Sequence, residues 1–164
     1  MSARVGSVIV LTLFALNSVQ ACGRNPPPGT IYDFSVTDID GQNVLLSKYR
    51  NKVCIIVNLQ RLYTKYAEGQ EPGTDEEIKQ RVLAKYNVTF DLFHKIDVNG
   101  DNAIPLYKFL KQSLSSWFSR NIEWNFVKFL VDKNGYPISR YSSITPPNSM
   151  ESEIRQLLGL SSEL

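Results

Sequence analysis

A run of apolar, mostly β-branched residues at Val53–Val57 (VCIIV) limits most strongly the folds open to this chain. Strands covered on both faces read as continuous hydrophobic runs, whereas half-exposed strands alternate apolar and polar residues. The run therefore predicts a central strand with a layer of structure on each face. A length of 164 residues provides one ordinary domain around such a strand.

Two hairpins are predicted, one before and one after this strand along the chain. Apolar and polar residues alternate within 31–49, on either side of a turn signal at Asp40-Gly41. The segment 124–141 has the pattern of a strand, a turn at 133–135 and a second strand. Both hairpins supply further strands for a sheet.

The spacing of apolar residues predicts helices at 59–69, 74–86, 104–114 and after Asn148. Thr74 and Glu77 form a capping box at the start of one of them, and Asn148 is the expected cap of the last. Strands mixed with covering helices indicate an α/β layered fold. Two helices directly after the central strand are unusual, because an α/β unit would place another strand between them.

The N-terminus has the pattern of a secretory signal peptide. Arg4 precedes a short apolar run at Val8–Leu16, and small residues follow up to Ala21, after which cleavage is expected. The run is too short to cross a membrane as a helix. A buried strand or a membrane anchor are the alternative interpretations of this segment.

The predicted organisation is a secretory signal peptide, a linker rich in proline and glycine, and one domain, at 1–21, 22–30 and 31–164. The predicted location is therefore extracellular. Asn87-Val88-Thr89 is an N-glycosylation sequon, which agrees with secretion.

Charge and metal-binding residue types exclude several classes of function. The formal net charge of +2 is too small to indicate a nucleic-acid or membrane-surface partner. Two cysteines, Cys22 and Cys54, make neither a disulfide framework nor a zinc site. His94 stands alone, and the residues around Asp97 and Asp101 lack the spacing of a calcium loop. No metal and no bound cofactor is expected.

Five blocks occur in a recognisable order: KVCIIVN, GQEPGTDEEI, FDLFHKIDVNG, LYKFLK and WNFVKFLVDKNGYPISRYS. Together they resemble the glutathione peroxidase family, over nearly all of 31–158. The resemblance implies a thioredoxin-like α/β fold, with a central sheet and helices on both faces. It also implies reduction of hydrogen peroxide or lipid hydroperoxides by glutathione or another thiol, in defence against oxidative stress.

The family's reaction uses a selenocysteine or cysteine whose anion attacks the peroxide O–O bond. Hydrogen-bond donors favour that anion and can protonate the departing oxygen. In this family the donors are a Gln, a Trp and an Asn. The resemblance assigns these roles to Gln70 in GQEPG and to Trp124 and Asn125 in WNF.

The nucleophile itself has no counterpart in this chain. The family continues from the central strand into a segment like V-A-S-K-C-G-x-T, whereas Asn58 is followed here directly by Leu59. A second block, a strand and loop like L-R-I-L-x-F-P-C-N-Q-F-G, is missing at Glu68-Gly69. We therefore expect one sheet strand to be missing, which would leave an edge of the central strand unpaired and cost several kcal/mol. Cys54 lies inside the strand and is expected to be a structural core residue.

Two hypotheses stay open at this point. The chain derives from a secreted peroxidase gene, with the nucleophile in a segment absent here; the selenocysteine codon is also a stop codon. Alternatively, it is a catalytically inactive isoform that acts as a binding or interaction module. The short connection 115–123 resembles the monomeric, phospholipid-hydroperoxide type, so the expected partners are peroxide and glutathione, without stable membrane insertion.

Overall fold

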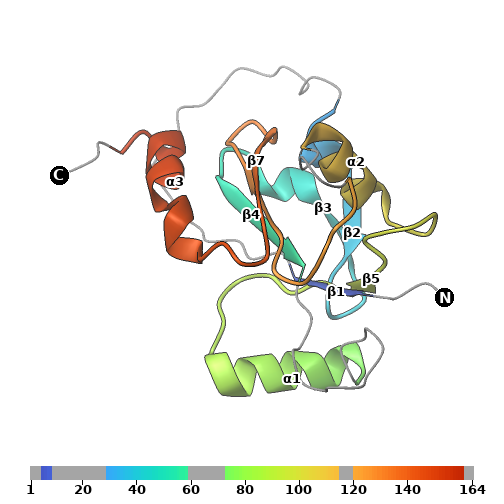
Figure 1. Cartoon of the computed structure of the whole chain (residues 1–164). Coiled ribbons are helices and arrows are strands. Elements are labelled where there is room, and N and C mark those ends of the chain that lie inside the picture. The colour runs from blue at the N-terminus through green and yellow to red at the C-terminus, as the bar shows by residue number, and fades with distance from the viewer. Residues whose placement is uncertain (1–4, 9–28, 59–72, 115–119, 161–164) are drawn as a thin grey trace.

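The computed structural model describes residues 5–8, 29–58, 73–114 and 120–160 (Figure 1). Its centre is a five-stranded sheet in the order β5-β1-β4-β6-β7, and a separate hairpin pairs β2 with β3. The sheet strands are β1 (Val5–Val8), β4 (Cys54–Asn58), β5 (Lys95–Ile96), β6 (Lys128–Val131) and β7 (Pro137–Tyr141). The helices are α1 (Asp75–Tyr86), α2 (Pro105–Ser113) and α3 (Glu151–Leu158).

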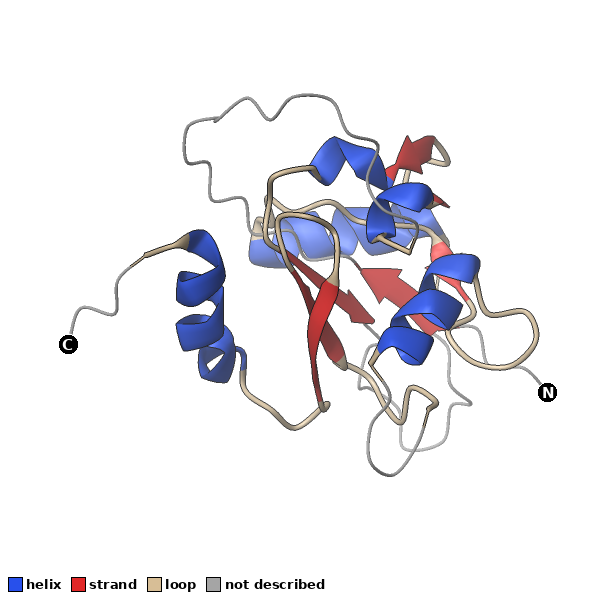
Figure 2. Ribbon diagram, turned by 90° about the horizontal axis from the view of Figure 1, so that it is seen from above, coloured by secondary structure: helices blue, strands red, loops and turns tan. Residues whose placement is uncertain are grey.

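β4 is the central strand, as its apolar sequence predicts. It pairs antiparallel with β6, and Ile56 lies opposite Phe129 in this register. Ile56 packs into the core on the side of α2, while Ile55 packs with Met150 and Leu158 on the side of α3. The two helices accordingly lie on opposite faces of the sheet (Figures 1 and 2). Both faces of β4 are covered, which explains why its residues do not alternate with polar ones.

The two predicted hairpins form. β2 (Ser35–Thr37) pairs with β3 (Asn43–Leu45), with Gly41 at a φ of 80° in the turn. β6 and β7 pair around the second turn, but β6 begins at Lys128 rather than at Trp124.

The two predicted helix caps have different outcomes. The Thr74 hydroxyl accepts a hydrogen bond from the Glu77 backbone N–H at 3.3 Å, and the Glu77 carboxylate accepts one from Thr74 at 2.7 Å. This confirms the capping box of α1. The Asn148 cap is wrong: Asn148 lies in a 3-10 helix (Pro147–Met150), and α3 starts at Glu151. Pro147 opens that turn and the buried Met150 fixes it against the core. The helix predicted at 59–69 lies outside the described residues.

The edge of β4 is paired, so the prediction of an unpaired edge is wrong. Ser7 and Val8 of β1 lie opposite Asn58 and Val57, in an antiparallel pair. An unpaired edge would leave backbone N–H and C=O groups without partners, and the extended N-terminal segment satisfies them instead. β1 ends at Val8, and the rest of the apolar run lies outside the described residues, so its interpretation as a signal peptide, a buried strand or a membrane anchor is not tested. Cleavage after Ala21 stays a prediction.

Candidate functional site

Asn58, at the carboxyl end of β4, holds the segment that precedes β6. Its side-chain Nδ2 donates to the Trp124 carbonyl oxygen at 3.0 Å, and its own carbonyl accepts from the Phe126 N–H at 2.8 Å. Phe126 has a φ of 60°, a left-handed conformation that delays the start of β6. The last residue before the predicted missing segment is thus hydrogen-bonded to the backbone on both sides of Asn125.

The two described donors differ in exposure. Trp124 is 61% exposed, whereas Asn125 is 5% exposed. An indole ring of this size is normally well buried, so its exposure beside the end of a central strand leaves it accessible to a ligand. Gln70 lies outside the described residues, so its position relative to this pair stays a prediction.

Three polar side chains fix the chain that leads to Trp124. Asn99 accepts from the Ile122 N–H at 2.9 Å and donates to the Ile122 carbonyl at 2.8 Å. Arg140 of β7 donates to the Asn121 carbonyl at 2.6 Å and forms an ion pair with Glu123 at 3.3 Å. These contacts place the Trp-Asn pair on a rigid support, which is what a preorganised donor set requires.

Lys128 lies close to Asn58 in the sheet and holds the loop after β7. The register places it opposite Val57, and its buried amine donates to the carbonyl oxygens of Ser142, Ser143 and Thr145 at 3.2, 3.5 and 2.6 Å. Burial lowers the pKa of this amine, and the three carbonyls compensate for lost hydration. The ammonium group is therefore used to hold the loop after β7.

Comparisons with known proteins show which proteins this chain is similar to. The family model for glutathione peroxidase matches residues 64–111. A Nicotiana sylvestris protein named "Probable phospholipid hydroperoxide glutathione peroxidase" is 44% identical, over 84% of this chain and 98% of its own length. A glutathione peroxidase of Schistosoma mansoni is 43% identical, over 79% of this chain and 93% of its own.

The chain belongs to the glutathione peroxidase family. Solved structures agree: the apo form of Trgpx has a TM-score of 0.63 at 29% identity and covers 80% of this chain and 97% of its own. GPX1 of T. cruzi has a TM-score of 0.60 at 27% identity, over 82% and 99%. The fold is therefore the thioredoxin-like fold of the glutathione peroxidases, as the sequence predicts.

The loss of the two family blocks stays a prediction. The absence of the nucleophile itself stays a prediction from the sequence.

Cys54 does not offer a replacement nucleophile in this glutathione peroxidase. Its side chain is 1% exposed, and its Sγ donates to the Lys52 carbonyl at 3.5 Å. Burial raises the pKa of the thiol from 9.0 to about 12, against a smaller opposing effect of Lys52. The thiolate is the reactive form, so a buried neutral thiol is inert. The prediction that Cys54 is a structural core residue is confirmed.

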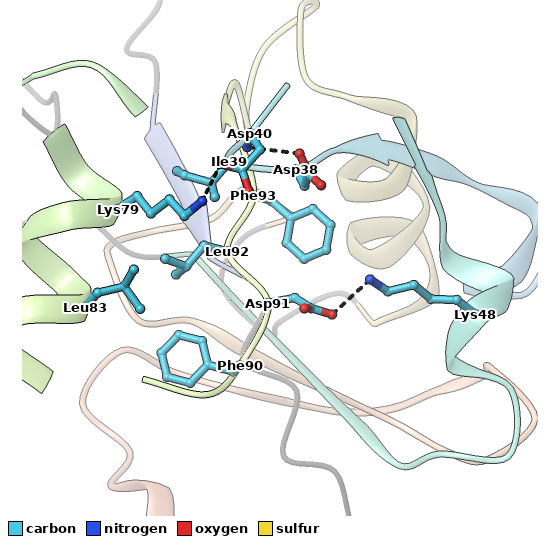
Figure 3. Close-up of a pocket in the computed structure, with 10 residues that line it drawn as sticks. All are labelled: Asp38, Ile39, Asp40, Lys48, Lys79, Leu83, Phe90, Asp91, Leu92 and Phe93. Atoms are coloured by element: carbon cyan, nitrogen blue, oxygen red, sulfur yellow. Dashed lines mark hydrogen bonds and ion pairs between the residues drawn. The ribbon is translucent and has the colours of Figure 1, made fainter. Parts of the chain in front are cut away.

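A pocket of about 190 Å³ lies between α1, the tip of the β2–β3 hairpin and the segment 90–93 (Figure 3). It is lined by Asp38, Ile39, Asp40, Lys48, Lys79, Leu83, Phe90, Asp91, Leu92 and Phe93. Four of its charged groups form two ion pairs: Lys48 with Asp91 at 3.1 Å, and Lys79 with Asp40. Neither Asn58 nor the Trp-Asn pair lines it, so this pocket is separate from the candidate site.

Sequence reasoning missed Asn58, although one signal was present: it is the polar residue that ends an apolar strand. Its side chain is 1% exposed, and its Oδ1 has no hydrogen-bond partner among the described residues. Buried polar atoms are normally paired. An unpaired acceptor at the carboxyl end of the central strand, where α/β folds place ligands, marks this as the centre of the candidate site.

Asn58→Asp is expected to lower the free energy of unfolding by about 3 kcal/mol at pH 7.5, because it introduces a buried charge. Burial would raise the pKa of the new carboxyl above its unfolded value. Its neutral form is therefore favoured in the folded state, and the loss should be smaller at pH 5. Urea unfolding at both pH values measures this. Asn43→Asp, at an exposed position of β3, is the control and should change little. Equal effects of the two substitutions would contradict the burial argument.

Proposed function

We propose that this protein is a glutathione peroxidase whose complete form reduces hydrogen peroxide or lipid hydroperoxides with glutathione or another thiol. The observation that carries the proposal is that Asn58 binds the backbone of Trp124 and Phe126, on either side of Asn125, at the strand end from which the family's nucleophile segment continues. Gln70 is the third proposed donor. The names of the relatives support lipid hydroperoxides as part of the substrate range.

The proposed reaction needs a selenolate or thiolate from the absent segment. That anion attacks one peroxide oxygen, a chalcogen–oxygen bond forms, and the O–O bond breaks. The departing oxygen takes a proton from water, and the indole N–H of Trp124 and the side-chain amide of Asn125 are the proposed hydrogen-bond donors that stabilise it. Two thiols then reduce the selenenic or sulfenic acid, which yields water and a disulfide and restores the nucleophile.

A second proposal concerns the chain as it stands: without the nucleophile it is a catalytically inactive isoform that acts as a binding or interaction module. The burial of Cys54 supports this, since the described residues offer no accessible thiol. The exposed Trp124 is a contact that such an isoform would retain. Sequencing the transcript across Asn58–Leu59 and Glu68–Gln70 decides whether a longer message exists or whether these junctions are real.

Grafting tests the peroxidase proposal directly. Both corresponding segments of the Nicotiana sylvestris relative are inserted, one after Asn58 and one after Glu68, and glutathione- or thioredoxin-coupled reduction of hydrogen peroxide is measured. The unmodified chain should stay at the background rate, and the graft should exceed it at least about a hundredfold, as expected for a positioned nucleophile with its donors. The matched control carries serine in place of the grafted nucleophile.

Substitution in the graft then separates the roles of the donors. Trp124→Phe and Asn125→Ala should each lower kcat/KM by roughly tenfold or more, because each removes a hydrogen-bond donor from the reacting oxygen or anion. The fold can be checked by the unchanged unfolding midpoint of Trp124→Phe, whose ring is mostly exposed. A folded graft with no activity, or with activity unaffected by either substitution, would contradict the proposed site.

We propose that the protein enters the secretory pathway through residues 1–21. Asn87 makes secretion testable, because it is an exposed residue that a glycan can reach. It lies at the end of α1 in a left-handed conformation, and its sequon continues through Thr89. Expression in mammalian cells should give secreted protein that loses mass with a glycosidase, and Asn87→Gln should abolish that change. N-terminal sequencing should begin near Cys22. Unglycosylated protein confined to the cells would contradict secretion.

We further propose that the protein is a monomer of the phospholipid-hydroperoxide type, because the connection 115–123 is short. Among the described residues, no helix is long and apolar enough to cross a membrane. Light scattering should give a mass near 18.6 kDa for the uncut chain. A tetramer would contradict this proposal.

A further inference from the structure

β1 is the link between two parts of the sheet. It pairs with β4 through Ser7 and Val8, and with β5 through Val5 and Gly6. In the described strand order, β5 has β1 as its sheet neighbour. Without Val5–Val8 the ordered sheet would reduce to β4, β6 and β7, and β5 would lose its strand partner.

The position that β1 fills is defined mainly by backbone groups. Two facing strand edges offer N–H and C=O groups to a short extended segment, which is the geometry of strand addition. The segment VGSV suits it, since two β-branched residues favour an extended backbone and Gly6 and Ser7 are small. The edge thus covered includes Asn58, the residue that anchors Trp124.

We propose that the space between β4 and β5 is an acceptor slot for one extended strand, and that the chain's own Val5–Val8 is its occupant. Cleavage after Ala21 would remove the occupant and open the slot beside Asn58. Retention of residues 1–21 and an open slot are therefore mutually exclusive states of the same chain. The inference depends on strand pairing and does not depend on peroxide chemistry.

Hydrogen exchange tests the slot by comparing the uncut chain with a chain that starts at Cys22. Backbone amides in 57–58 and 95–96 should exchange at least about tenfold faster in the shorter chain, because these are the residues that β1 pairs with. A synthetic peptide of residues 4–10 (RVGSVIV), with lysines added for solubility, should restore slow exchange. If the shorter chain does not fold, the same peptide should restore folding.

Proline substitution provides a test that keeps the full length. Gly6→Pro and Val8→Pro each remove a backbone donor from β1 and should speed exchange in the same two segments. Ser18→Pro, outside the described strand, is the matched control and should leave exchange unchanged. Equal exchange in the two chain lengths, or no effect of the peptide, would overturn the proposal. A dimer that requires residues 1–21 would show that a second copy supplies the strand, which also contradicts it.

Discussion

In the native chain, Cys54 is expected to react with a thiol-modifying reagent at least about a thousandfold more slowly than in the unfolded chain. Burial raises the pKa of the thiol from 9.0 to about 12. The fraction of thiolate at neutral pH therefore falls about a thousandfold. Steric protection by the core lowers the rate further, since the side chain is 1% exposed.

The measurement uses Cys22→Ser, which leaves Cys54 as the one remaining cysteine. Reaction with a chromogenic disulfide at pH 7.5 is followed in buffer and in urea. The urea concentration lies above the unfolding transition, at roughly 6 M for a small domain. Cys54→Ser should also leave peroxide reduction at background. Fast native labelling, or thiol-dependent peroxide turnover abolished by Cys54→Ser, would make Cys54 a reactive residue and contradict its structural role.

Alkaline conditions are expected to unfold the protein steeply above about pH 9.5. Burial raises the pKa of Cys54 to about 12, and burial followed by the hydrogen bond to Glu153 raises that of Tyr141 to about 12. Burial also raises the pKa of Tyr32 and Tyr49 well above the usual range. Each of these groups holds its proton more tightly when folded. Their contribution is thus complete below the unfolded pKa and is lost as the pH rises toward the folded pKa.

Each such proton contributes up to about 1.4 kcal/mol per pH unit between the two pKa values. The lowered pKa of Lys128 and Lys111 opposes this trend, because these amines release their protons more readily when folded. The buried thiol and tyrosines outnumber them, so the net slope is destabilising. The urea concentration at the unfolding midpoint, measured at pH 7, 9 and 10.5, should fall as the pH rises. Most of the fall should occur between pH 9 and 10.5.

Tyr49→Phe identifies one contributor to that slope. It removes a hydroxyl that donates to Asp91, so it should lower stability at pH 7 and flatten the pH dependence above pH 9.5. Tyr86→Phe is the matched control, since this ring is 63% exposed. A urea midpoint that does not change between pH 7 and 10.5 would contradict the assignment of buried protonated groups.

The candidate site combines a rigid donor pair with the strand end after which the nucleophile is expected. Asn58, Asn99 and Arg140 hold the backbone around Trp124 whether or not a nucleophile is present. Support for the site is therefore independent of the attacking group.

Local sequence determined those features whose cause lies within a few residues. The VCIIV run specifies a strand covered on both faces, and Thr74 with Glu77 fixes the start of α1, because burial pattern and capping act over short distances. The order of the blocks identified the family, and the resemblance predicts the Trp-Asn pair. Even the cap at Asn148 failed only because the buried Met150 and the preceding prolines favour a 3-10 turn there.

Tertiary structure alone decided how distant segments satisfy one another. Nothing near Val5–Val8 in the sequence indicates β4 or β5 as its partner, since backbone hydrogen bonding is available to any extended segment. The contact between Asn58 and Trp124 likewise joins residues far apart in the chain. The sequence thus determined the family, and the residue types of the site stay its prediction. The fold decided which backbone closes the sheet and which side chain holds the donors in place.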